Sequence, residues 1–173
     1  MSKKRALIVG GVAGGASAAA RLRRLDENID IVIFEKGEYI SFANCGLPYH
    51  IGEVIKDRNN LILQSPEKMK NRFDIDVRVN SEVVSVDAEN KIVKVVSKNN
   101  GTYEEKYDYL VLSPGAKPIQ PNLPGKDSKR IHTLRTINDM DGIKVEVDNG
   151  NVKNAIVIGG GYIGIEVCEN LKH

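Results

Sequence analysis

The residues with the clearest potential for chemistry surround one cysteine, in residues 41–49 (SFANCGLPY). Asn44 is a candidate N-cap for a short helix that carries Pro48 in its first turn. The N-terminal end of a helix stabilises a thiolate, which is the reactive form of cysteine. The type and position of Cys45 therefore predict a redox-active thiol.

The second cysteine has a different setting. Cys168 lies in the middle of a predicted helix among Ile165, Val167 and Leu171. A free cysteine in such surroundings behaves as a small hydrophobic side chain, so we expect Cys168 to be buried and without a redox role. Two cysteines far apart in the chain fit neither a secreted disulfide framework nor a metal-ligand cluster. We therefore expect a protein of the cytoplasm without a metal site.

Composition disfavours several other classes. The 173 residues carry a net charge of only +2 although 28% of them are charged, which argues against a general polyanion binder. Tryptophan is absent and aromatic residues make up 5%, which disfavours a base-stacking surface. The basic start and the apolar run behind it resemble a signal peptide, but four glycines interrupt the run. We expect neither nucleic acid nor membrane as a partner.

The elements that must position Cys45 begin with a glycine turn. An apolar strand over residues 6–9 leads into glycine-rich residues 10–15, then a helix to about Leu25 and a second strand over 29–34 that ends at Glu35. This order is the dinucleotide-binding pattern, in which the helix N-terminus attracts a pyrophosphate and the acid accepts ribose hydroxyls. The alternative is a turn that is only structural, because Val12 replaces the second glycine of G-x-G-x-x-G.

The helix after this turn has two predicted faces. The apolar face, expected to pack on a sheet, comprises Ala18, Leu22 and Leu25. The polar stripe comprises Ser17, Arg21 and Arg24. From spacing alone, the stripe is best explained as a solvated surface.

The rest of the chain divides into short elements. Ser65 and Pro66 predict the start of a helix that ends near Arg72. Four strands are expected over residues 75–79, 83–86, 92–96 and 102–107, then a central parallel strand over 108–113. Prolines mark a linker over 118–125, before a short strand over 131–134 and a helix over 136–147. A last strand over 155–158 leads into a complete G-x-G-x-x-G at 159–164 and a helix through Leu171.

These motifs, in this order, resemble the pyridine nucleotide-disulfide oxidoreductase superfamily across essentially the whole chain. Residues 108–116 (DYLVLSPGA) look like its second flavin motif, and Leu134-Arg135 followed by Asp139 looks like the segment that leads into its NAD domain. Residues 41–49 are similar to the coenzyme A-disulfide reductases and the related coenzyme A-dependent NADH oxidases and persulfide reductases.

The resemblance implies a cofactor or substrate for each group of residues. For FAD it implies Gly10, Val12, Ala13, Gly14, Gly15, Glu35, Lys36, Val83, Ser113, Gly115, Ala116 and Arg135. For NADH or NADPH it implies Gly159, Gly161, Tyr162, Ile163 and Gly164. For coenzyme A it implies Ser17, Arg21, Arg24, Ser41 and Asn44, of which Arg21 stands where some relatives carry an amide. It implies that Cys45 is the nucleophile.

The implied chemistry follows from a missing cysteine. Dithiol members of the superfamily carry a second cysteine five residues after the first, where this chain has His50. The resemblance therefore implies that Cys45 forms a mixed disulfide with coenzyme A and reduces coenzyme A disulfide or persulfide. One rival is a flavin NADH oxidase or peroxidase with a sulfenic acid at Cys45. Such enzymes usually carry a histidine where this chain has Ala13. A second rival is an FAD-binding fragment without turnover.

The expected fold class is α/β. A Rossmann-like FAD-binding domain, with a parallel sheet and a three-stranded β-meander, is followed by the first strand and helix of a second Rossmann-like NAD(P) domain. The expected boundaries are 1–120 for the FAD domain, 121–150 for a linker and connecting helix, and 151–173 for a truncated NAD(P) domain. The resemblance implies that a later segment completes the flavin domain and that the complete protein is a homodimer. The chain by itself is expected to be inactive.

Overall fold

The computed structural model describes residues 3–150 and 152–172; the predictions that fall on residues 1–2, 151 and 173 lie outside the described residues. The chain forms two compact units. The first comprises Met1–Phe42 and Ile62–Gly115, and the second comprises Ala43–Leu61 and Ala116–His173. The domain boundaries expected at residues 120 and 150 stay a prediction.

The first unit is built on a four-stranded parallel sheet, as expected. Its strands are β1 (Arg5–Val9), β2 (Asp30–Phe34), β3 (Asp76–Arg78) and β7 (Tyr109–Leu112), in the order β3-β2-β1-β7. The strand predicted over 108–113 does pair with β1 in parallel. Its predicted central position is wrong, because β7 lies at an edge of the described sheet and β1 and β2 occupy the centre.

A second sheet of three antiparallel strands confirms the predicted meander. Its strands are β4 (Ser81–Asp87), β5 (Ile92–Ser97) and β6 (Gly101–Lys106), in sequence order. A left-handed residue stands at the end of each connection: Lys91, with φ of 54°, directly precedes β5, and Gly101, with φ of 67°, is the first residue of β6. The α/β fold class predicted from the sequence is confirmed.

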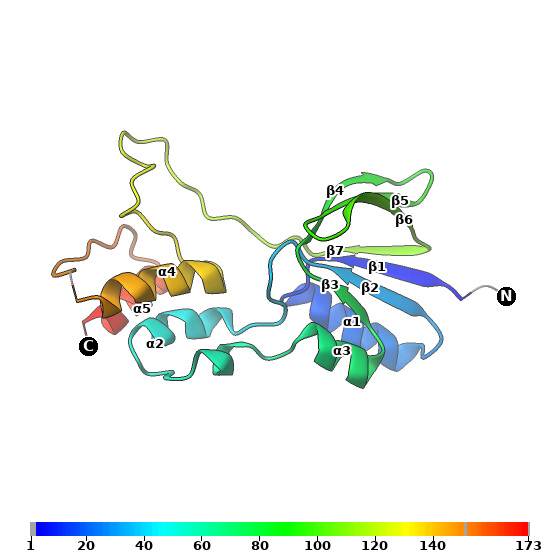
Figure 1. Cartoon of the computed structure of the whole chain (residues 1–173), viewed down its shortest axis with the longest axis horizontal. Helices are drawn as coiled ribbons and strands as arrows, with labels where there is room; N and C mark the ends of the chain where they lie inside the picture. Colours follow the sequence, from blue (N-terminus) through cyan, green and yellow to red (C-terminus); the bar gives the residue numbers. More distant parts are fainter. Residues whose placement is uncertain (1–2, 151, 173) are drawn as a thin grey trace. The chain divides into compact units, whose positions relative to one another are not determined.

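Alternation along the parallel strands produces three layers (Figure 1). Ile8 and Ile33 belong to a core formed with α1 (Gly14–Leu25) and α3 (Pro66–Phe73). Leu7 is adjacent to Ile8 in β1, and Phe34 is adjacent to Ile33 in β2. Both therefore point to the opposite face and belong to a core formed with the three-stranded sheet. The parallel sheet is thus buried on both faces, which explains why its strands read as continuous apolar runs.

The buried face of α1 differs from the predicted one. Ala16 and Ala19 are buried, Leu22 packs partly against the same core, and Leu25 is 66% exposed. Leu25 lies well round the helix from the Ala16–Ala19 face, since successive residues turn by about 100°. The predicted packing of Leu25 is therefore wrong.

Arg78 joins the two sheets of the first unit. Its guanidinium lies over the rings of Phe34 and Tyr103, 5.5 and 5.8 Å from their centroids. The Arg78 Nη1 donates to Glu105 at 2.6 Å and its Nε to Asp76 at 2.9 Å. Partial burial opposes the charge of Arg78, yet the hydrogen bonds to Glu105 and to the Tyr103 hydroxyl, together with the nearby Asp76 carboxylate, raise its pKa.

The predicted start of α3 is confirmed by its cap. The Ser65 Oγ accepts a hydrogen bond from the backbone N–H of Lys68 at 3.2 Å, and Pro66 occupies the first turn. At the other end, Asp74 adopts the left-handed conformation with φ of 49°.

Removing this cap is expected to destabilise the protein. Ser65→Ala leaves the N–H of Lys68 without its side-chain acceptor and should lower the free energy of unfolding by about 1 kcal/mol. Urea denaturation followed by circular dichroism measures the change. Ser65→Asp keeps an acceptor and should stay close to wild type; equal losses in both variants would contradict the role of the cap.

The second unit is helical. A 3₁₀ turn (Asn44–Gly46) leads into α2 (Leu47–Ile51), and α4 (Ile137–Asp148) and α5 (Tyr162–Leu171) pack on α2. The helix predicted over 136–147 is confirmed, because Thr136 and Asp139 form a capping box at its start. The buried apolar side chains of this unit include Leu47, Ile51, Leu61, Ile137 and Met140.

Three expectations for the second unit are wrong. Residues 131–134 and 155–158 form no strand in the described chain, and Ile156 and Ile158 are 90% and 94% exposed. A strand needs a neighbouring strand to satisfy its backbone, and these segments have none among the described residues. Cys168 is exposed rather than buried, since α5 buries Asn170 instead. No described helix is long and apolar enough to cross a membrane.

Candidate functional site

The first glycine turn lies at the carboxyl ends of β1, β2 and β7. Gly10 has a φ of +94°, and its N–H donates to the carbonyl of Phe34 at 2.8 Å. The N–H of Ser113 donates to the carbonyl of Val9, also at 2.8 Å. A Cβ atom at Gly10 would lie 2.0 Å from the Ser113 carbonyl oxygen. The turn and the predicted second flavin motif are therefore in direct contact.

The same turn packs tightly on itself and leaves the start of α1 open. A Cβ atom at Gly15 would lie 1.7 Å from the Gly10 carbonyl oxygen, so only glycine fits there. The N-cap of α1 is Ala13, and no side chain caps it with a hydrogen bond. The orphan N–H groups and the positive end of the helix dipole at Gly14 can therefore receive a phosphate.

Glu35 is held beside the turn by backbone groups. Its side chain is buried, and Oε2 accepts from the N–H of Gly11 while Oε1 accepts from the N–H of Gly37, both at 2.8 Å. A carboxylate has about four acceptor positions, so each oxygen keeps one for a ribose hydroxyl. The arrangement fits the predicted role of Glu35.

The other residues expected to contact FAD have varied settings. Lys36 is exposed, Val12 is half-buried, and Val83 packs its side chain into the core beneath the three-stranded sheet. Gly115 is exposed with φ of +73°. In the second unit, the Arg135 Nε donates to the Ala116 carbonyl at 3.4 Å.

Ser41 ties the start of the cysteine stretch to the glycine turn. It has a φ of 43°, an unusual left-handed conformation for a residue other than glycine. Its N–H donates to the Gly11 carbonyl and its carbonyl accepts from Leu63, both at 3.0 Å. The backbone hydrogen bonds to Gly11 and Leu63 therefore hold Ser41 in this conformation.

Cys45 is an exposed free thiol in the middle of the Asn44–Gly46 turn. The N-cap of α2 is Gly46, so the predicted capping by Asn44 is wrong; the 3₁₀ turn takes up Asn44 before α2 begins. His50 is buried, and its Nδ1 lies 2.6 Å from the Ile55 carbonyl oxygen. Cys45 thus has no second thiol five residues on, and the residue there is engaged with the backbone.

The second glycine turn repeats the geometry of the first. Gly159 has a φ of +113°, and a Cβ atom at Gly164 would lie 2.1 Å from the Gly159 carbonyl oxygen. Gly161 is the N-cap of α5 without a capping side chain, and Tyr162 and Ile163 are exposed. The turn therefore has a glycine with positive φ and a close backbone approach, like the first turn, even though residues 155–158 form no strand.

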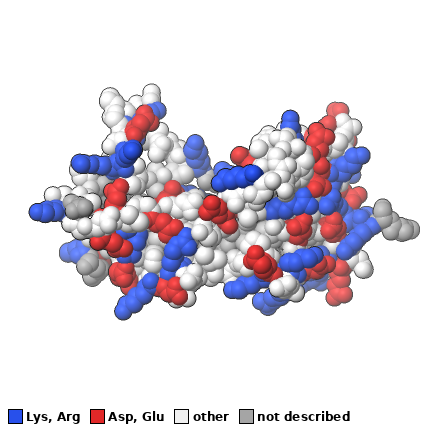
Figure 2. Space-filling model, in the orientation of Figure 1, with Lys and Arg blue, Asp and Glu red and all other residues white. Residues whose placement is uncertain are grey.

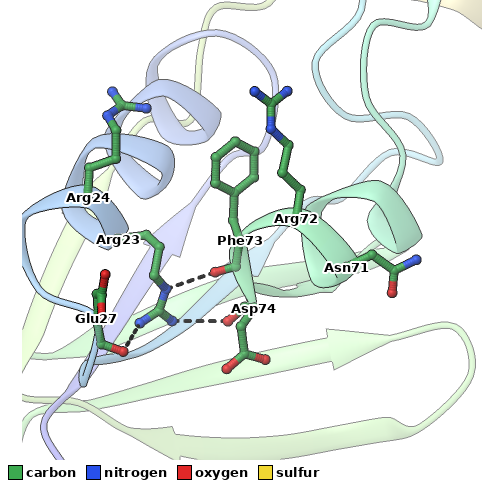
Figure 3. A pocket seen from close by; sticks show the side chains of 7 residues that line it. All are labelled: Arg23, Arg24, Glu27, Asn71, Arg72, Phe73 and Asp74. Carbon is green, nitrogen blue, oxygen red and sulfur yellow. Dashed lines mark hydrogen bonds between the residues drawn. The ribbon is translucent and has the colours of Figure 1, made fainter.

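The polar stripe of α1 borders an open depression. Ser17, Arg21 and Arg24 are all exposed. Arg24 also lines a cavity of about 420 Å³ between α1 and α3 (Figure 3). The other lining residues are Arg23, Glu27, Asn71, Arg72, Phe73 and Asp74.

Arg23 builds this depression and leaves Arg24 and Arg72 at its rim. Its guanidinium donates to the carbonyls of Phe73 at 2.8 Å and Asp74 at 3.0 Å, which holds the end of α3 against α1. The Arg72 guanidinium lies 5.0 Å from the centroid of the Phe73 ring. In Figure 3, the side chains of Arg24 and Arg72 extend to the same side, with the Phe73 ring between them.

The charge balance at the depression favours an anion. Lys70 binds Asp74 at 2.5 Å and lowers the pKa of that carboxyl, so this acid is already paired. Elsewhere, on the face shown in Figure 2, basic and acidic side chains are interspersed. Sequence patterns missed Arg72, because no motif links it to Arg24; only the packing of α3 on α1 does.

The fold and the site define a Rossmann-type dinucleotide-binding protein with an exposed thiol. Residues 4–173 match the family model described as pyridine nucleotide-disulphide oxidoreductase. The chain belongs to this family.

Similar proteins include coenzyme A disulfide reductase of Staphylococcus haemolyticus, 43% identical over 169 residues, which cover 97% of this chain and 38% of that protein. The solved structure of reduced CoADR-RHD from Bacillus anthracis is 52% identical with a TM-score of 0.95, over 99% of this chain and 31% of that one. An NAD-dependent persulfide reductase from A. fulgidus is 33% identical with a TM-score of 0.92, over 97% of this chain and 32% of that one. The chain thus spans less than two fifths of each relative.

Proposed function

We propose that this chain forms the flavin and thiol portion of an FAD-dependent NAD(P)H oxidoreductase that reduces coenzyme A disulfide or coenzyme A persulfide. The observation that carries the proposal is an exposed Cys45 with the buried His50, and not a second cysteine, five residues on. A redox thiol without a second cysteine at that position takes its disulfide partner from a substrate. The names of the similar reductases support coenzyme A as that partner.

The first glycine turn fits FAD. Gly10 and Gly15 allow close backbone approach, the uncapped start of α1 receives the pyrophosphate, and Glu35 accepts the ribose hydroxyls. When bound, FAD supplies the two-electron transfer from NAD(P)H that returns a mixed disulfide to thiols. The turn at 159–164 is the proposed site of NADH or NADPH.

Cys45 performs the exchange step. Its thiolate attacks one sulfur of coenzyme A disulfide; the substrate S–S bond breaks, a Cys45–coenzyme A disulfide forms, and one coenzyme A thiolate leaves. Ser41 and Asn44 flank the thiol in sequence and are proposed to contact the coenzyme A. Ser17, Arg21 and Arg24 are proposed to bind its phosphates, and the depression adds Arg72 to that set. As part of the same proposal, the complete protein is a cytoplasmic homodimer.

The rival enzyme is an NADH oxidase or peroxidase with a sulfenic acid at Cys45, which Ala13 at the start of α1 disfavours. In a protein where the remaining family segments continue this chain, we expect NAD(P)H oxidation without oxygen when coenzyme A disulfide is added. Oxidation that requires oxygen and ignores the disulfide would overturn the proposal. For an FAD-binding fragment without turnover, the purified chain would be yellow with bound FAD, and NADH would not bleach that colour.

The two rim arginines are expected to bind phosphate. Arg24→Gln and Arg72→Gln should each weaken binding of adenosine 3′,5′-bisphosphate about tenfold, since a hydrogen bond to a charged group contributes about 1.5 kcal/mol. Titration calorimetry on this chain measures the dissociation constants. Lys68→Gln removes an exposed positive charge of α3 that does not line the depression. An equal loss of affinity in Lys68→Gln would show that binding depends on the net charge of the chain and not on the depression.

A further inference from the structure

Helix α5 contacts its unit through a polar side chain. Asn170 is 5% exposed and is the buried residue of α5, although Ile163 and Ile165 of the same helix are exposed. The Asn170 Nδ2 donates to the Glu166 carbonyl at 2.8 Å. A Cβ atom added at Gly52 would lie 2.5 Å from the Asn170 Oδ1 and 2.8 Å from its carbonyl oxygen. Asn170 therefore lies directly against the backbone of Gly52.

Contact, and not backbone conformation, excludes a side chain at Gly52. Its φ of −85° and ψ of 16° lie in the bridge region, which residues other than glycine also adopt. Gly52 is the C-cap of α2, and its N–H donates to the carbonyl of Pro48 at 3.1 Å. The close approach of Asn170 is therefore the reason that glycine fits at this helix end.

Helix α4 holds the segment that follows Gly52. The Arg58 Nε and Nη2 donate to the two carboxylate oxygens of Asp141 at 2.7 and 2.6 Å. Lys144 of the same helix forms an ion pair with Glu53. The end of α2 is thus held both by α4 and, through Asn170, by α5.

Two helices lead from this contact to the proposed chemistry. Helix α2 begins at Leu47, directly after the turn that contains Cys45. Helix α5 begins at the second glycine turn and reaches Asn170 near its end. Because packed interiors transmit displacements, a shift of Asn170 against Gly52 must move α2 or open its last turn.

We propose that the contact between Asn170 and Gly52 positions α2 and thereby the thiol of Cys45. Asn170 is a positioning residue, because it acts through α2 and not on the reacting sulfur. The inference rests on the proposed role of Cys45. Alkylation of that thiol tests it without disulfide turnover, so failure here and failure of the proposed function are distinguishable.

The test uses Gly52→Ala and Asn170→Ala in a Cys168→Ser background, so that Cys45 is the single thiol. The lower entropy of the unfolded chain alone predicts that Gly52→Ala stabilises the protein and slows exchange. The contact predicts the opposite: amide hydrogen exchange across residues 44–52 should accelerate about fivefold in both variants. The rate of Cys45 alkylation by iodoacetamide should change by about threefold or more.

Two matched variants separate positioning from stability. Gly142→Ala places a methyl group in the interior of α4, where nothing lies within 4 Å, and should stabilise the protein without altering Cys45 alkylation. Glu169→Ala removes an exposed polar side chain next to Asn170. Unchanged exchange in both test variants would overturn the proposal. Faster exchange with a wild-type alkylation rate would also overturn it, because the contact would then stabilise α2 without positioning the thiol of Cys45.

Discussion

Cys45→Ser is expected to slow formation of the coenzyme A adduct sharply. When this chain is incubated with coenzyme A disulfide, its intact mass should rise by one coenzyme A at Cys45 and return to the original value after reduction. Without the Cys45 thiolate there is no nucleophile at the site, so the rate of adduct formation should fall about tenfold or more. Electrospray mass spectrometry at timed intervals measures this rate.

The second free thiol supplies the control. Cys168 is exposed as well, so surface accessibility alone predicts that both cysteines react. Cys168→Ser should form the adduct at the wild-type rate, since α5 offers that thiol no proposed site for coenzyme A. Equal rates in Cys45→Ser and Cys168→Ser would refute the assignment of Cys45 as the specific thiol.

Gly15→Ala is expected to disrupt the first nucleotide turn. Its Cβ atom would lie 1.7 Å from the Gly10 carbonyl oxygen and 2.9 Å from the Gly10 carbonyl carbon, which are backbone atoms that cannot rotate away. The start of α1 must then move, and the free energy of unfolding should fall by about 3 kcal/mol or more. Urea denaturation followed by circular dichroism measures the loss of stability. Titration with FAD measures the accompanying loss of FAD affinity.

The adjacent glycine tests whether this effect is specific. At Gly14, the nearest atom to an added Cβ is the Ser113 Oγ at 3.1 Å, and a hydroxyl can rotate. Gly14→Ala should therefore change the free energy of unfolding by less than about 1 kcal/mol. A loss in Gly14→Ala as large as that in Gly15→Ala would contradict the close approach of Gly15 to Gly10 as the cause, because alanine itself favours a helix more than glycine does.

Features that depend on neighbouring residues could be predicted well. The turn from β1 into α1, the Ser65 cap and the helix that starts after Thr136 are confirmed, because each satisfies backbone groups within a few residues. The same holds for the glycine turn at 159–164, whose internal contact forms without a sheet beside it.

Features that depend on distant partners could not be predicted. Residues 155–158 read as a strand, yet pairing requires another strand that the described chain does not provide. Cys168 read as buried, but burial depends on what covers α5. The depression that unites Arg24 with Arg72 exists because Arg23 binds the carbonyls at the end of α3.

Residue type and spacing were enough to identify the class of protein, the two glycine turns and the thiol at Cys45. These rest on local chemistry: glycines where a turn needs them, free N–H groups at a helix start, and a cysteine without a second one five residues on. Only the tertiary structure shows that Glu35 accepts hydrogen bonds from two backbone N–H groups. It also shows that Arg72 and Arg24 line the same depression and that Asn170 lies against Gly52. Such contacts join residues far apart in the chain, so they arise only when the helices and sheets have assembled.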